Sequence, residues 1–71
     1  MITTAYARNS ILPWCIESIR ILRRSARAMP LESPHRTAEL LRAREMLAQA
    51  HIWRDYIRTG ERMDRRAQAW D

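Results

Sequence analysis

The chain has 71 residues and a net charge of +5, and all 13 of its basic residues are arginine. A chain of this length makes one domain at most, residues 1–71, and buries a smaller fraction of its surface than a larger domain does. Small domains usually gain the missing stability from a disulfide, a metal or a second subunit. The single cysteine, Cys15, excludes an internal disulfide framework, and no paired Cys/His spacing predicts a zinc site. Oligomerisation is the remedy that remains.

The positive charge suits three kinds of partner: nucleic acid, an anionic membrane or an acidic protein surface. No apolar run approaches the ~18 residues of a transmembrane helix. The N-terminus lacks the charged start and apolar core of a secretory signal, so a cytoplasmic protein is expected. Because residues 1–30 are rich in arginine and poor in acid, a transit peptide is an alternative, although its removal would leave no foldable remainder.

The beginning of the first helix has two interpretations. Thr3 or Thr4 can cap a helix that continues through Pro13, or Ser10 is the cap and Pro13 lies in the first turn, where its missing N–H costs little. We prefer some helix before Pro13. The first helix therefore begins at about residue 3, or alternatively at residue 11, and ends at residue 29.

From residue 11 onward this helix has one apolar seam and one basic face. The apolar residues recur at intervals of three and four, which is typical of a helix packed along one partner: Leu12, Cys15, Ile19, Leu22, Ala26 and Met29. The opposite face carries Arg20, Arg23, Arg24 and Arg27. Glu17 can pair with Arg20, whereas the other three lack an acidic partner within the helix.

A short connector from Met29 to Pro34 leads into a second helix, residues 34–59. Ser33 and Pro34 are favoured immediately before and at the first helical position. A link this short predicts that the two helices form an antiparallel hairpin in an all-α fold. Gly60 is a candidate stop, yet the spacing of Met63, Ala67 and Trp70 favours a helical C-terminal extension that continues through it.

The second helix is apolar on two faces, whereas a surface helix usually has one apolar stripe. One face combines Leu40, Ala43, Met46, Leu47, Ala50, Trp53 and Ile57, and we expect it to close against the first helix, centred on Leu40, Leu47, Ala50 and Ile57. The other face combines Leu41, Ala48, Ile52 and Tyr56. In the hairpin the first helix covers only one of these faces, and the second face stays exposed. The sequence therefore predicts self-association into a dimeric four-helix arrangement.

The spacing of possible catalytic residues in the sequence does not indicate an active site. His35 and His51 have no nucleophile or carboxylate at a spacing that defines an acid–base pair, and one glycine cannot build a phosphate-binding loop. We therefore predict no catalytic residue, no metal and no cofactor. The candidates for partner binding are Arg20, Arg23, Arg24 and Arg27 with Trp53 and Tyr56, because Arg, Trp and Tyr dominate interface energetics.

In its length, helical-hairpin pattern and arginine-rich composition the chain resembles small phage-encoded proteins that bind and inhibit a host regulator, such as anti-activators of bacterial transcription. The resemblance implies a protein that binds and inhibits another protein. With the predicted dimerisation and the positive charge, we expect a homodimer whose partner has an acidic surface. The alternative is a basic helical nucleic-acid-binding protein, since four arginines on one helix face can neutralise phosphates. A membrane surface is disfavoured because the arginines lie opposite the apolar seam.

Overall fold

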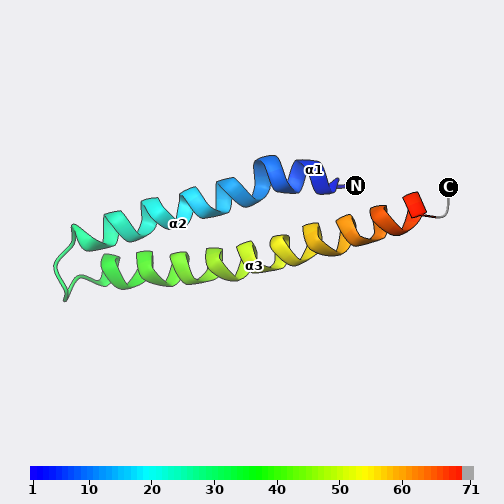
Figure 1. The fold of residues 1–71 in the computed structure, drawn as a ribbon. Helices are drawn as coiled ribbons and strands as arrows, with labels where there is room; N and C mark the ends of the chain where they lie inside the picture. Colours follow the sequence, from blue (N-terminus) through cyan, green and yellow to red (C-terminus); the bar gives the residue numbers. More distant parts are fainter. Residues whose placement is uncertain (70–71) are drawn as a thin grey trace.

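A computed structural model describes the backbone of residues 1–69 and the side chains as far as Arg65. Its elements are α1 (Thr4–Tyr6), a π-helical turn η1 (Ala7–Ile11), α2 (Leu12–Arg27) and α3 (Pro34–Ala69). The first three follow one another without a break and form one arm, and α3 runs antiparallel beside them as the second arm (Figure 1). The predicted all-helical fold is confirmed for the described residues.

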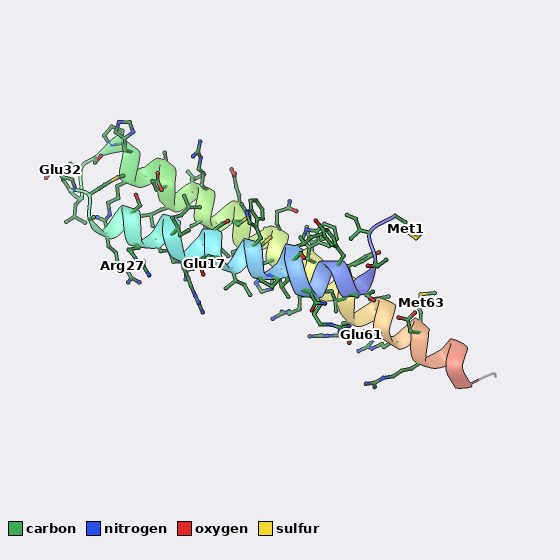
Figure 2. All side chains as sticks on the ribbon, turned by 90° about the horizontal axis from the view of Figure 1, so that it is seen from above. Met1, Glu17, Arg27, Glu32, Glu61 and Met63 are labelled. Carbon is green, nitrogen blue, oxygen red and sulfur yellow. The ribbon has the colours of Figure 1, made fainter. Side chains whose placement is uncertain are left out.

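The molecule is a thin rod of 59 × 18 × 15 Å. Its radius of gyration is 16.6 Å, compared with about 11 Å for a globular chain of this length. Both views show that α3 continues past the N-terminal turn, and Met63 lies on this projecting part (Figures 1 and 2). The chain therefore packs as two layers of helix with no third layer to cover them.

The first arm begins where the first of the two interpretations places it. Thr3 has an extended backbone, and its hydroxyl accepts a hydrogen bond from the Tyr6 amide at 3.1 Å. Pro13 lies inside the arm, as the second residue of α2 and two residues after the end of η1. A proline lacks the N–H of an α-helix and its ring crowds the carbonyl four residues earlier. The wider π turn, in which the Leu12 amide donates to the Ala7 carbonyl, accommodates this crowding.

The extra residue of η1 rotates the N-terminal turn relative to α2. Counting back from Leu12 at intervals of four and three would place Arg8 and Ala5 against α3. The π turn adds one residue, so Ala7 and Thr4 face α3 instead. Ala7 is fully buried, whereas Arg8 stays at the edge and forms an ion pair with Glu61.

The seam between the two arms consists mainly of small side chains. Its buried residues are Ala7, Cys15, Ile19, Ala26, Ala43, Ala50 and Ile57. At its centre, Cys15 and Ile19 pack against Ala50, and half-buried neighbours such as Met46 and Trp53 close around them. The predicted seam of α2 is thus found in the structure, with Cys15 in the buried role expected of an unpaired cysteine on an apolar face.

The predicted packing face of α3 is partly wrong. Leu40 and Leu47 are 44% and 38% exposed, although we expected them at the centre of the contact. The residues that do face the first arm follow the same intervals of three and four as α2 itself: Ala43, Met46, Ala50, Trp53, Ile57 and Gly60. Two helices that cross at a shallow angle keep a narrow seam, so the leucines one position to the side are left out of it.

Gly60 is not a helix stop, because α3 passes through it without a positive φ. It is instead a point of close approach: a Cβ atom at residue 60 would overlap Thr4 Cγ2. Two further contacts join the arms here, the hydrogen bond from the Tyr56 hydroxyl to the Ile2 carbonyl and the Arg8–Glu61 ion pair. The expected helical extension beyond Gly60 is therefore present as far as residue 69, and Trp70 lies outside the described residues.

At the other end of the rod, residues 28–33 connect the arms. The Ala28 amide donates to the carbonyls of Arg24 and Ser25 and closes α2 two residues before its predicted end. The Ser33 carbonyl accepts from the amides of Arg36 and Thr37, which starts α3 at Pro34 as expected. Such small differences at helix ends are ordinary.

Candidate interaction surfaces

The seam divides the surface of the rod into two sides of opposite character. In both helices the residues of the seam recur at intervals of three and four. Because the helices are antiparallel, residues at equivalent positions of this repeat lie on the same side of the pair. We call these the groove side and the arginine side. The face of each helix that points away from the seam, which we call its back, separates the groove side from the arginine side.

On the groove side, a hollow of about 710 Å³ runs between α2 and α3. It is lined by Ser18, Ile21, Leu22, Arg42, Glu45, Met46 and Gln49. A second hollow of about 460 Å³ continues along the same side of the first arm, lined by Tyr6, Ser10, Ile11 and Trp14. The charged residues of the larger hollow, Arg42 and Glu45, cancel, so this side is nearly neutral and largely apolar.

Aromatic residues gather on the groove side. Trp53 is half-buried and packs against the core, and its ring meets Tyr56 edge to face at 5.6 Å between centroids. Trp14 is exposed on the first arm. Trp53 packs against the cluster that contains Cys15, the residue next to Trp14. Trp14 and Trp53 therefore lie at a similar level along the rod. Trp53 and Tyr56, both predicted as binding residues, therefore belong to a larger aromatic surface.

The face that we expect to mediate self-association is uncovered in the hairpin. Leu41, Ile52 and Tyr56 are 53%, 59% and 40% exposed, and Ala48 is also exposed. Leu41 and Ala48 lie on the back of α3, whereas Ile52 and Tyr56 border the groove side. The four residues are thus the outer edge of an apolar surface that reaches across both helices.

The arginine side draws on both helices. By their offset from the seam, its members are Arg20, Arg23, Arg27, Arg44, Arg54, Arg58 and Arg65, all of them exposed. Figure 2 shows Arg27 on the edge of α2 away from α3. Arg24, the remaining residue of the predicted cluster, lies on the back of α2 beside this set. The contribution of α3 could not be assigned from the sequence, because it depends on how the two helices are rotated against each other.

Few acidic groups neutralise the arginine side. Glu61, the acidic residue that lies on this side, is already paired with Arg8. Glu17 lies on the back of α2 and approaches Arg20 at 3.8 Å, with both side chains exposed. The Arg54 guanidinium is 3.1 Å from the His51 ring. By this assignment the side carries seven arginines and Glu61, whereas Glu17 and Asp55 lie on the adjoining backs of the helices.

The two histidines lie far apart along α3. His35 lies in the first turn of α3, whereas His51 lies more than four turns further along, on the arginine side. Among the residues that the structure describes, no three His, Cys, Asp or Glu side chains lie close enough to hold a metal ion. What the described surface offers is an apolar side and a basic side, and both are suited to binding.

Within the described part of the chain, no helix combines the length and the apolar character that crossing a bilayer requires. In comparisons with known proteins, the chain matches no family model, no curated protein and no solved structure.

Proposed function

We propose that the chain is a non-enzymatic interaction module that acts as a homodimer, two hairpins meeting through their groove sides in a four-helix arrangement. Its arginine sides then remain free for a partner of opposite charge. The modulation or inhibition of another protein, implied by the resemblance to small phage inhibitors, is one use of such a module.

The observation that carries the proposal is the excess of exposed surface. The chain exposes 6,087 Å², whereas a compact monomer of 8.5 kDa exposes about 4,700 Å². Among the side chains that the structure describes, the largest fully buried one is Cys15. A hairpin with so small a core is marginal by itself, and a second layer of helices would supply the missing burial.

The groove side is suited to a second copy of the same chain. The excess of roughly 1,400 Å² is more than the ~800 Å² that each partner buries in a standard interface. In a two-fold dimer both protomers contribute the same surface to the interface. Arg42 of one protomer can therefore face Glu45 of the other. The arginine side cannot pair with itself in this way, because like charges repel.

The experiment is a measurement of mass in solution, by light scattering at micromolar concentration. We expect twice the chain mass for the native sequence and the chain mass for Ile52→Glu, since a carboxylate on the groove side would have to be buried in the dimer. Leu40→Glu is the matched control, an exposed aliphatic residue of α3 on the arginine side, and it should leave the dimer intact. A compact, stably folded monomer of the native sequence would refute the proposal.

A further inference from the structure

The arginine side has the regularity of a surface built for a long polyanion. On α3, basic residues recur every seven positions along one line: Arg44, His51, Arg58 and Arg65. On α2, Arg20 and Arg27 have the same spacing. Seven helical residues span about 10.5 Å, so the line on α3 extends for roughly 30 Å. Arg23 and Arg54 lie in parallel lines closer to the seam.

We propose that this side binds the phosphodiester backbone of a nucleic-acid duplex, and that the dimer bridges two such duplexes. The bridging rests on the proposed homodimer: if the groove sides meet, the two arginine sides point in opposite directions. Each can then engage a separate duplex. A chain of this kind would hold two double-stranded segments side by side with one dimer between them.

Arginine is the residue type that fits phosphate. Its planar guanidinium offers paired N–H donors to two oxygens of one anion, and it keeps its charge at any pH the protein meets. A straight row of such groups can follow a uniformly charged backbone without contacting base edges. Binding through this side is therefore independent of sequence, and salt weakens it because bound counterions are released.

The placement of the aromatic residues favours a duplex over a single strand and over an acidic protein. Single-strand binders stack unpaired bases on exposed aromatic rings, and protein interfaces combine arginine with aromatic anchors such as Trp and Tyr. In the described part of the chain, Trp14, Trp53 and Tyr56 all lie on the groove side. The aliphatic residues that the arginine side does hold, such as Leu40 and Leu47, are nearer to the seam than its outer row of arginines.

The test begins with titration of a labelled 30-base-pair DNA duplex, an RNA duplex of the same length, a single strand and polyglutamate, at several salt concentrations. We expect both duplexes to bind, and for DNA a log–log salt slope of about −4.5 if some five phosphates are contacted. Failure of both duplexes to bind at low salt, or equal binding of single strand or polyglutamate, would overturn the inference. Neither result bears on whether the chain dimerises.

Two charge-matched variants locate the site. Arg44→Gln with Arg58→Gln should lower duplex affinity about tenfold and flatten the salt slope by about two. Arg24→Gln with Arg42→Gln removes the same charge from the back of α2 and from the groove side, and should have a much smaller effect. Equal losses in the two variants would mean that net charge alone drives binding, and the arginine side would no longer be the site.

Bridging is measured by energy transfer between two differently labelled duplexes. The native dimer should bring them together, whereas Ile52→Glu should bind duplex without bridging. A native chain that is dimeric and binds duplex yet never bridges would overturn the proposed geometry. If the mass in solution shows that the native chain is a monomer, the proposed homodimer is refuted. This result is independent of the titration, which tests duplex binding alone.

Discussion

Gly60 shows how much one residue can determine in a thin hairpin. It lies in the middle of a helix, where glycine is unfavourable relative to alanine by about 1 kcal/mol. The compensation is the approach of Thr4, whose methyl group occupies the space that a Cβ at residue 60 would need. A glycine that looks like a helix stop in the sequence is thus a contact point between residues distant in the chain.

This interpretation predicts opposite signs for one substitution in two backgrounds. In the native sequence, Gly60→Ala should destabilise the protein by about 1–2 kcal/mol, because the overlap with Thr4 displaces the N-terminal turn. In a Thr4→Ser background, which lacks Cγ2, the same substitution should stabilise by up to about 1 kcal/mol through helix propensity. Denaturant unfolding of the four variants measures both effects, and destabilisation of similar size in both backgrounds would show that Thr4 is not the obstacle.

At the scale of the elements, the π turn η1 matters because it adjusts the rotation of one arm. It places Ala7 in the seam and leaves Arg8 beside Glu61. Without the extra residue, the intervals from Thr4 to Ala7 to Leu12 to Cys15 would be three, four and three, the same pattern as the rest of the seam. The turn therefore behaves as a one-residue insertion into a regular repeat.

Deletion of Ser10 should accordingly be tolerated. The shortened arm can form a regular helix, with Thr4 and Ala7 still facing α3, and we expect the helical circular dichroism signal and the thermal midpoint to stay within a few degrees of the native values. As a control, deletion of Arg20 shifts the seam of one half of α2 by one position and should lower the midpoint substantially. Equal damage from both deletions would mean that the π turn has a role of its own.

At the scale of the whole molecule, stability should depend on protein concentration if folding and association are linked. A tenfold dilution removes about 1.4 kcal/mol from a dimer, which corresponds to a fall in the thermal midpoint of about 5 °C for two chains of this length. Calorimetry or circular dichroism over a hundredfold range of concentration measures it. A midpoint that does not move with concentration would contradict a dimer held together by the fold.

The sequence predicts the two arms, their antiparallel arrangement and the α2 seam, because these depend on local periodicity and on the short connector. The prediction for Leu40 and Leu47 is wrong, because a helical wheel shows the broad apolar face of α3 but not which of its residues contact the other helix. The residues of α2's basic cluster are visible in the sequence. Their alignment with Arg44, Arg54 and Arg58 is not, because it arises only when the two helices pack.

The contact between Thr4 and Gly60 also has a consequence for how the chain folds. The connector at residues 28–33 brings neighbouring turns of α2 and α3 together across a very short loop, so the chain entropy lost in the first contacts is small. Contacts between the arms can then form in order from the connector outward. The N-terminal turn packs against α3 last, because this contact joins residues far apart in the chain. The same order in reverse makes the end near Gly60 the place where the rod opens first.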